Sequence, residues 1–467
     1  MSFLICIGAL LFLMFVAYRG FSVILFAPIA ALGAVLLTNP SLVLPVYSGL
    51  FMDKMVFFIQ NYFPVFLLGA LFGKVIEMSG FARAIVTAVI GMVGRKRAVL
   101  SIVLVGGLLT YGGVSLFVVV FAVYPFAAEM FRQGNLPKRL IPGTIALGAF
   151  TLTMDSLPGT PQIQNVIPTT FFKTDIYAAP ILGTIGGIFI LVCGVAYLEW
   201  RLKQAEADGE GYGSGHSQEP DPDVIAGTSI VNPVIAILPL FVVGIMNLVF
   251  TKLIFPTYYA SANAEINLPG LAKPIAVVVK TQIGIWSVEA ALVLGILTVV
   301  LFAFKTISTK FADGSKAAVA GSLLASVNTA TEYGFGAVIA ALPGFMVIKD
   351  ALQAIPNPLV NEAITVTTLA GVTGSASGGM GIALAAMANQ FVASANAAGI
   401  PLEVLHRVAA MASGGMDTLP HNGAVITLLA VTGLTHRQSY MDIFAITCIK
   451  TAAVFLVILV YYLTGLV

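Results

Sequence analysis

Two aspartates stand inside long apolar segments of the chain, and each is followed three residues later by a proline. Asp155 belongs to the sequence Met-Asp-Ser-Leu-Pro at 154–158, and Asp417 belongs to the sequence Met-Asp-Thr-Leu-Pro at 416–420. A carboxylate in hydrocarbon needs a partner, and a proline removes a backbone donor and interrupts a helix. A membrane tolerates such backbone only where it is buried in protein or lines a cavity. The repeated sequence therefore predicts two broken helices, each with an ion-binding aspartate.

A helix interrupted in this way has two exposed ends with opposite electrostatic preferences. Its first half ends in free carbonyl groups, which attract cations, and its second half begins with free N–H groups, which attract anions. We therefore expect a cation or a proton at Asp155 and Asp417, with His421 as a third titratable group. The residues expected to bind a carboxylate at the starts of the second half-helices are Gly159, Thr160, Gln162, His421, Asn422 and Gly423.

Glycine-rich polar stretches interrupt two other apolar segments, at 110–115 and 373–381. Glycine lets the backbone approach a ligand closely, and the neighbouring hydroxyl groups can donate hydrogen bonds. Because each stretch joins two half-length apolar arms, it predicts the tip of a re-entrant hairpin. The tip residues expected to contact a ligand are Thr110, Gly112, Gly113, Ser115, Ser375, Ser377, Gly378 and Gly379.

Structural explanations compete with each of these functional ones. An aspartate before a helix is a favoured N-cap, and a histidine such as His421 can be a hydrogen-bonded structural group. Glycines commonly allow membrane helices to pack closely. Three glutamates also fall within apolar segments. Glu77 lies close to Lys74 and can pair with it, whereas Glu289 and Glu332 are further candidates for a proton relay.

The composition places the chain in a membrane. Hydrophobic residues make up 58% of it and charged residues 9%, a balance far from that of soluble proteins. Apolar segments of about 18 to 25 residues, enough to cross about 30 Å of hydrocarbon, recur along the chain. The sequence holds no metal-ligand cluster and no nucleophile with a base at a plausible spacing. We therefore expect an all-α polytopic membrane protein that is not an enzyme and has no cofactor, metal or nucleic-acid partner.

The apolar segments fall into two halves with the same order of features. Each half is predicted to contain five transmembrane spans, one re-entrant hairpin and one broken helix, and an odd number of crossings inserts the second half upside down relative to the first. The fold class expected is therefore a pair of inverted repeats. The boundaries are a first repeat at 1–199 with its hairpin at about 98–131 and broken helix at about 140–172, a hydrophilic cytoplasmic linker at 200–227, and a second repeat at 228–467 with its hairpin at about 361–396 and broken helix at about 403–432.

Basic residues indicate the orientation. Lys and Arg gather in the loops on the side of the linker, as in the run Arg95–Arg97 and at Lys138 and Arg139. By the positive-inside rule this side is cytoplasmic. We therefore expect a multi-pass protein of the bacterial inner membrane with both termini in the periplasm, and with the two hairpins entering from opposite faces.

Three stretches carry a resemblance to a known family. The sequences at 154–161, 375–381 and 413–424 resemble the ion transporter superfamily and, within it, the gluconate permease (GntP) family. The form Met-Asp-Thr-Leu-Pro-His-Asn-Gly is similar to a branch that carries 3-hydroxybutyrate and other short organic acids. The first break departs from that of true gluconate permeases, which have a His- and Pro-rich loop there. The resemblance implies a homodimer and a transport domain that moves as an elevator.

Two functions fit these observations. The first is a secondary active transporter that imports a small organic carboxylate, such as 3-hydroxybutyrate or gluconate, with a coupling ion. A proton is favoured over sodium because Asp155, Asp417 and His421 offer titratable groups. The alternative is a cation/proton antiporter of the same fold with no organic substrate. Polar groups suited to a carboxylate, at Thr160, Gln162, His421 and Asn422, favour the symporter.

Overall fold

The structure, a computed structural model, describes residues 2–19, 21–94, 97–216, 219, 231–259, 263–271, 273–347, 355–420 and 422–467. The helices before the hydrophilic segment are α1 Ser2–Tyr18, α2 Val23–Thr38, α3 Val43–Val46, α4 Met52–Met78, α5 Phe81–Val93, α6 Ala98–Tyr111, α7 Leu116–Gln133, α8 Ile141–Ala149, α9 Leu152–Asp155, α10 Ile163–Phe172 and α11 Pro180–Ala207. The short helices between them are η1 Pro40–Leu42, η2 Tyr47–Phe51 and η4 Lys138–Leu140.

The second half of the chain has the elements α13 Pro233–Val249, η5 Phe250–Ile254, α14 Phe255–Tyr258, β1 Asn263–Ile266, β2 Ile275–Val278, α15 Val279–Ser308, α16 Phe311–Ala341, α18 Pro358–Thr373, α19 Ala376–Ala397, α20 Leu402–Ser413, α21 Gly423–Thr432 and α22 His436–Thr464. Within the described residues, five helical segments are long and apolar enough to cross a membrane: Pro40–Met78, Pro180–Ala207, Pro233–Tyr258, Gln282–Ser308 and His436–Thr464. The expected helical membrane character of the chain is thereby confirmed.

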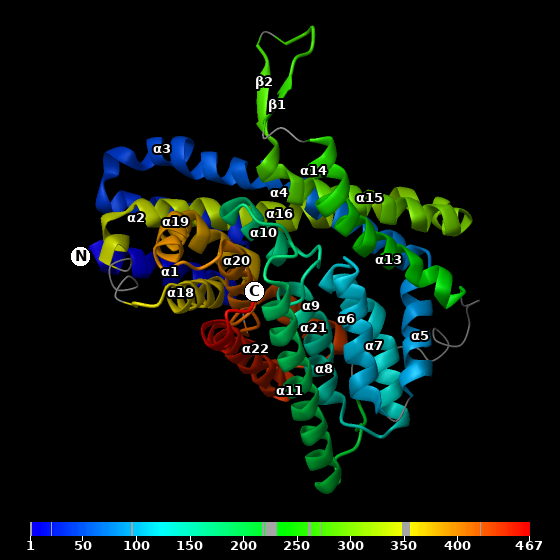
Figure 1. Ribbon diagram of the computed structural model, residues 1–467. Coiled ribbons are helices and arrows are strands. Elements are labelled where there is room, and N and C mark those ends of the chain that lie inside the picture. The colour runs from blue at the N-terminus through cyan, green and yellow to red at the C-terminus, as the bar shows by residue number, and fades with distance from the viewer. Residues whose placement is uncertain are drawn as a thin grey trace.

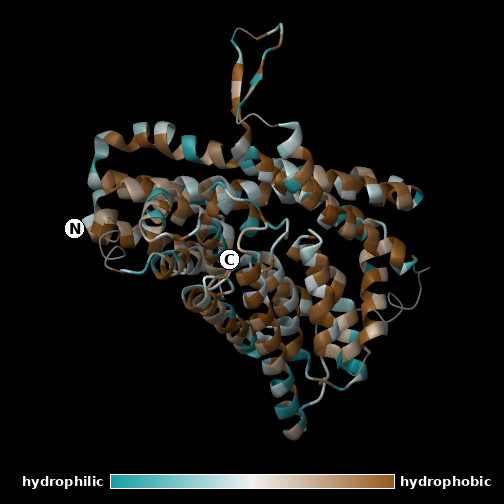
Figure 2. Ribbon diagram, in the orientation of Figure 1, coloured by the Kyte–Doolittle hydropathy of each residue, from teal (hydrophilic) through white to brown (hydrophobic). Residues whose placement is uncertain are grey.

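The helices form two groups. Long helices α4, α13, α15 and α16 lie across one side of the molecule, and α16 packs along α4 more extensively than any other pair of elements (Figure 1). The second group contains α6 to α11 and α18 to α22, in which α11 packs against α22 and α10 against α20. We call these the scaffold group and the break group. Figure 2 shows hydrophobic residues over most helices of both groups and hydrophilic residues at the free end of α11.

Both halves of the chain contain a pair of helices joined by a tight turn and then a helix that is interrupted. The turn Gly112–Ser115 joins α6 to α7, and Gly374 and Ser375 join α18 to α19. The interruptions lie between α8 and α10 and between α20 and α21, at the two Asp-Pro sequences. Ser375 caps α19 by accepting a hydrogen bond from the Gly378 N–H at 3.1 Å, a common way to satisfy a helix start.

The hydrophilic segment expected from residue 200 begins as a helix. α11 continues to Ala207, and within this hydrophilic part Arg201 donates a hydrogen bond to Asp442 on α22 at 2.8 Å. Beyond the helix, Glu210 accepts from Arg139 at 2.7 Å, and Glu219 accepts from Lys138 at 2.7 Å. The described start of the linker is therefore bound to the break group. Residues 220–230 lie outside the described part of the chain.

A two-stranded hairpin is present in a chain that was expected to be all-α. Strands β1 and β2 pair in antiparallel fashion, with Asn263 opposite Val278 and Ile266 opposite Ile275. The hairpin projects away from the helices (Figure 1), and nearly all its residues are exposed. Strands of four residues without a buried face leave no alternating pattern in the sequence, which explains why they were not anticipated.

Candidate functional site

The two aspartates of the broken helices are both buried, and a buried lysine is paired with one of them. Asp155 is the last residue of α9 and is 1% exposed, and Asp417 lies between α20 and α21 and is 5% exposed. The ammonium group of Lys450, on α22, donates to Asp417 Oδ1 at 2.8 Å. Both side chains of this ion pair are almost fully removed from solvent. A buried charge is retained in proteins when it is paired in this way.

Lys450 also bonds to the end of the first half-helix. Its ammonium group donates to the Phe150 carbonyl oxygen at 2.9 Å, and Phe150 is the residue that follows α8. The last carbonyl groups of a helix lack partners within it and carry partial negative charge. The end of the broken helix, where the sequence suggests a bound cation, is therefore contacted by a cation that the chain itself supplies.

The Asp155 carboxylate lies next to Gly414, a glycine just before the second Asp-Pro sequence. Its Oδ1 accepts from the Ser156 hydroxyl at 2.9 Å, whereas its Oδ2 has no hydrogen-bond partner among the described residues. A side chain at Gly414 would overlap this Oδ2 atom and would lie 3.3 Å from Lys450 Cε. Gly414 thus leaves room for the Asp155 carboxylate beside the lysine. We call Asp155, Asp417 and Lys450 the break cluster.

A buried arginine adds a second positive charge near Asp155. Arg407, on α20, is 0% exposed. Its guanidinium group donates to the backbone oxygens of Asp155 at 2.9 Å and Ala178 at 2.8 Å. The arginine therefore holds the end of α9 against the chain that leads into α11. Lys450 and Arg407 were not assigned a role from the sequence, although a basic residue within an apolar segment is itself a functional signal.

His406 is a buried histidine that sequence reasoning overlooked. Its Nδ1 lies 2.7 Å from the Thr174 hydroxyl and its Nε2 lies 3.1 Å from Asn165 Oδ1. Asn165 donates its amide hydrogens to Thr160 O at 3.0 Å and Ile176 O at 2.8 Å, so its oxygen accepts from Nε2. One ring nitrogen thereby joins α20 to α10, and the other joins it to the segment just after α10. The other histidine of interest, His421, lies outside the described residues.

Two N-cap residues connect each break to the neighbouring turn. Gln162, before α10, donates from Nε2 to the Thr110 carbonyl oxygen at 2.7 Å. Asn422, before α21, donates from Nδ2 to the Gly374 carbonyl oxygen at 2.7 Å and accepts from the N–H of Val425 at 3.1 Å. The same device therefore occurs in both halves. These amide groups, expected to bind a substrate, are used to hold the turns against the broken helices.

The remaining polar residues of the first break and the turns mostly satisfy local backbone. Thr160 donates to the Thr153 carbonyl oxygen at 2.7 Å, and the Thr110 hydroxyl points to the Ala149 carbonyl oxygen at 3.5 Å. Ser377 is different, because its hydroxyl lies 3.3 Å from that of Thr329 on α16 of the scaffold group. The turn after α18 is therefore in polar contact with the scaffold group.

The glycines of the turns allow close packing. A side chain at Gly112 would meet Leu240 of α13, and one at Gly379 would meet the backbone of Ala370 on the paired helix. At two other positions the backbone conformation requires glycine. Gly113 has φ of 95° and Gly159 has φ of 83°, and residues with a side chain rarely adopt this left-handed region. A side chain at Gly423 would meet nothing within 4 Å. The backbone of Ser115 lies close to Gly73 of α4, and Gly378 lies against Glu332 of α16.

A pocket of about 240 Å³ lies where the two groups of helices meet. Lys54 is the one charged residue that lines the pocket, and its Nζ lies 3.8 Å from Oδ2 of the neighbouring Asp53. Lys54 is 40% exposed, so its ammonium group remains available to an anion. The other lining residues are Phe57 of α4, Phe171 of α10, Tyr333 of α16, and Leu384, Ala385, Ala386, Ala388 and Asn389 of α19.

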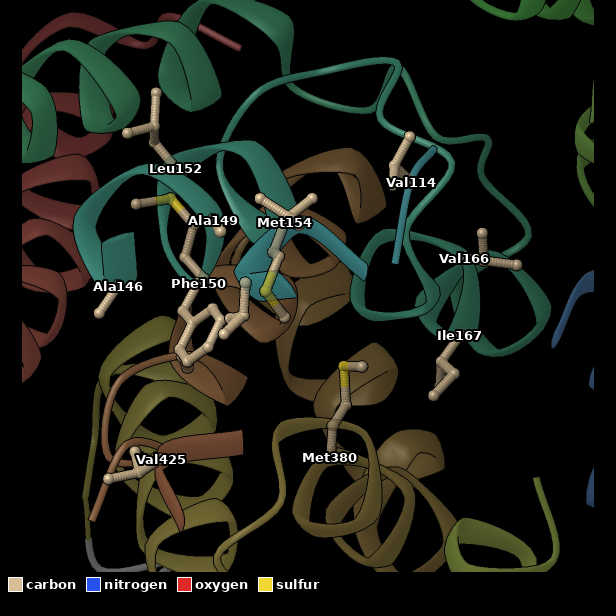
Figure 3. Packing of buried hydrophobic residues seen from close by; sticks show 14 of the residues in the cluster. Val114, Ala146, Ala149, Phe150, Leu152, Met154, Val166, Ile167, Met380 and Val425 are labelled. Carbon is tan, nitrogen blue, oxygen red and sulfur yellow. The ribbon is translucent and has the colours of Figure 1, made fainter. Parts of the chain in front are cut away.

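Apolar side chains from distant segments enclose the first break. Figure 3 shows Phe150 and Met154 of the break, Met380 of α19 and Val425 of α21, with Met154 and Met380 pointing toward one another. All four are 2% exposed or less. This packing removes water around the break cluster, and charge interactions strengthen when water is excluded.

Comparison with known proteins identifies a close relative and similar solved structures. The uncharacterized transporter YxjC of Bacillus subtilis (strain 168) is 59% identical over 474 aligned residues, which cover 100% of both chains. The crystal structure of the Alcanivorax borkumensis YdaH transporter, described as having an unusual topology, matches 89% of this chain and 88% of its own with a TM-score of 0.52 at 13% identity. At that identity the likeness concerns the fold alone. No family model matches the sequence.

Proposed function

The chain belongs to the family of the Bacillus subtilis transporter YxjC and is a membrane transporter, and we propose that it couples import of a small organic carboxylate to protons. The substrate class, such as 3-hydroxybutyrate or gluconate, follows the resemblance of the second break to the GntP family. The observation that carries the proposal is the break cluster, in which one buried carboxylate, Asp417, is paired with the buried ammonium group of Lys450 and a second, Asp155, lies beside them across Gly414.

The position of Lys450 favours a proton over sodium as the coupling ion. A sodium ion at the end of α8 would take carbonyl and carboxylate oxygens, and here the Phe150 carbonyl and Asp417 are already bonded to Lys450. Sodium would therefore have to displace the ammonium group. A proton needs no such space, since it binds directly to a carboxylate. Asp155, with one oxygen unpartnered, and Asp417 are the proposed proton acceptors.

The pocket at Lys54 favours an anionic substrate over a transporter of cations alone. Its single ammonium group attracts a carboxylate, and the rings of Phe57, Phe171 and Tyr333 offer apolar surface for a short carbon chain. This combination is typical of sites for small organic acids. From the pocket, we propose that the carboxylate moves to the second turn and the second break, where Ser377 and the open space at Gly423 lie.

Two groups of helices suit an elevator mechanism. The proposed transport domain is the break group, which holds both turns and both breaks, and the proposed fixed domain is the scaffold group, which would form the interface of a homodimer. The elements follow the same order in the two halves, and in each half an amide side chain before the second half-helix, Gln162 or Asn422, donates a hydrogen bond to the backbone of the tight turn. Both observations support two inverted repeats. An inner-membrane location with both termini in the periplasm follows from the positive-inside rule.

Uptake into proteoliposomes tests the proposal. Labelled 3-hydroxybutyrate is offered with a pH gradient or a sodium gradient imposed separately, and unlabelled gluconate serves as a competitor. Accumulation under the pH gradient alone is expected, and Asp417→Asn should abolish it while the protein remains folded in the membrane. Uptake driven only by sodium would refute proton coupling. No uptake under either gradient, with proton release on adding sodium, would instead establish the cation/proton antiporter.

A further inference from the structure

Glu332 is a buried acid that the proposed function does not use. It lies on α16 of the scaffold group and is 1% exposed. Its Oε2 atom has no hydrogen-bond partner within the described part of the chain. A buried carboxylate without a partner is costly in its ionised form, because nothing replaces the water it has lost. An acid kept in such a place calls for an explanation.

The Glu332 carboxylate faces the turn between α18 and α19. The Ser375 hydroxyl oxygen, at the start of α19, accepts from the Gly378 N–H at 3.1 Å. A side chain at Gly378 would overlap Glu332 Oε2, so the glycine allows the carboxylate to touch the start of α19. Thr329, one turn earlier on α16, contacts Ser377. The scaffold group and the break group therefore meet at this carboxylate.

Among the described residues, no Lys or Arg side chain forms an ion pair with Glu332. The elements packed against α16 are α2, η2, α4, α15 and α19, and α2 and α19 contain no charged residue. The charged residues of α4 pair with one another, Asp53 with Lys54 and Glu77 with Lys74. The remaining titratable groups on these elements, other than Lys280 at the start of α15, are Asp313, Lys316, Tyr333, Tyr47, Tyr62, Glu289 and Lys305, and none of them forms an ion pair with Glu332 among the described residues.

The corresponding place in the first half holds no acid. The sequence Phe-Gly at 335–336 of α16 matches Phe-Gly at 72–73 of α4, and Gly336 and Gly73 each lie against a paired helix at Ile382 and Val118. By the same alignment, Glu332 corresponds to Gly69, where a side chain would meet nothing within 4 Å. The acid is thus specific to the contact with the second turn, and packing of the repeat does not require it.

We propose that Glu332 is a second proton-binding site, which controls whether the turn after α18 stays docked on α16. In the docked arrangement the carboxyl group is enclosed and must carry a proton. When the proton leaves, the charge is stabilised only if water reaches it, and the turn must then move away. Low pH therefore favours the docked arrangement and high pH the undocked one. A single proton linked in this way changes the ratio of the two arrangements by at most about tenfold per pH unit.

The inference rests on the proposed movement of the break group, and its test uses no substrate. Spin labels are placed at two exposed positions, Val319 on α16 and Asn396 on α19, in the full chain reconstituted into lipid nanodiscs. Their distance distribution is measured by pulsed electron paramagnetic resonance from pH 5.5 to pH 8.5. The docked distance should dominate at low pH, and a second distance should grow as the pH rises. Glu332→Gln should show the docked distance throughout.

Two further variants make the result decisive. Thr329→Val removes the neighbouring polar contact but no titratable group, so its pH response should match that of the native chain. Glu332→Asp keeps a carboxyl group and should retain a pH response, which covers the case in which Glu332→Gln does not fold. Identical pH responses in the native chain and Glu332→Gln, or none in the native chain and Glu332→Asp, would overturn the proposal. Because no substrate is present, these outcomes are independent of whether a carboxylate is transported.

Discussion

Replacing Lys450 by methionine tests the break cluster directly. Methionine keeps most of the length of the side chain and removes its charge, which leaves Asp417 and the Phe150 carbonyl without the donor at 2.8 and 2.9 Å. Both members of the ion pair are at most 5% exposed, so water cannot take over. Removing one partner of a buried ion pair costs about 3–5 kcal/mol. We expect Lys450→Met to lower the free energy of unfolding by about that amount.

Adding Asp417→Asn should restore much of the free energy of unfolding that Lys450→Met removes. Asp417→Asn in the Lys450→Met background removes the orphaned charge, and a neutral pair in place of a buried ion pair is often no less stable. We therefore expect a coupling energy of at least about 2 kcal/mol between the two positions. The two single variants, the double variant and the native chain form a double-mutant cycle, measured by denaturant unfolding in mixed micelles.

A matched control separates this effect from loss of charge in general. Lys305, near the end of α15, is exposed and forms no ion pair within the described residues. Lys305→Met should change the free energy of unfolding by less than about 0.5 kcal/mol. Additive effects of Lys450→Met and Asp417→Asn, within about 0.5 kcal/mol, would refute the reasoning, since they would mean that the two side chains do not interact.

Three other predictions follow from single contacts. Gly414→Ala should abolish uptake, because the added methyl group overlaps the carboxylate of Asp155; normal uptake would separate Asp155 from the second break. Lys54→Ala should raise the KM for an organic carboxylate by up to about fivefold without changing the maximal rate, and Lys54→Arg should restore it; an unchanged KM would remove the pocket from the substrate route. The hydrogen bond from Arg139 holds the pKa of the Glu210 carboxyl below its usual value, so this contact stabilises docking of the linker above the usual carboxyl range and is lost as the pH falls through the lowered value. Hydrogen exchange in residues 208–216 should therefore be faster in Glu210→Gln than in the native chain at pH 6 but not near pH 3, and equal rates at pH 6 would contradict this.

Much of the local structure could be predicted from the sequence, because it depends on short-range physics. The Asp-Pro sequences at Asp155 and Asp417 coincide with interrupted helices because proline cannot continue the hydrogen bonds of a helix. The glycine-rich stretches coincide with tight turns at Gly113 and Gly374, both with positive φ, a conformation that glycine adopts at little cost.

Contacts between distant segments could not be predicted in the same way. Gln162, Thr160 and Asn422 were expected to bind a carboxylate, which stays a prediction, and in the structure their side chains bond backbone oxygens. A sequence shows that an amide is available at a helix start, but not whether another part of the chain already occupies it. The exposed strands β1 and β2 escaped prediction for a related reason, since nothing buried marks them.

By itself the sequence determined that this is a helical membrane protein with two interruptions and an acid at each, because helix length, hydropathy and proline act within a few residues. Only the tertiary structure decided that Lys450 bonds Asp417 and that Glu332 faces the second turn. In the sequence, α21 and the first half of α22 separate Asp417 from Lys450, and the end of α16 and the whole of α18 separate Glu332 from the second turn. The energy of a charge pair depends on the distance between the two groups and on how far water is excluded around them. The order of residues in the sequence specifies neither the distance nor the exclusion of water.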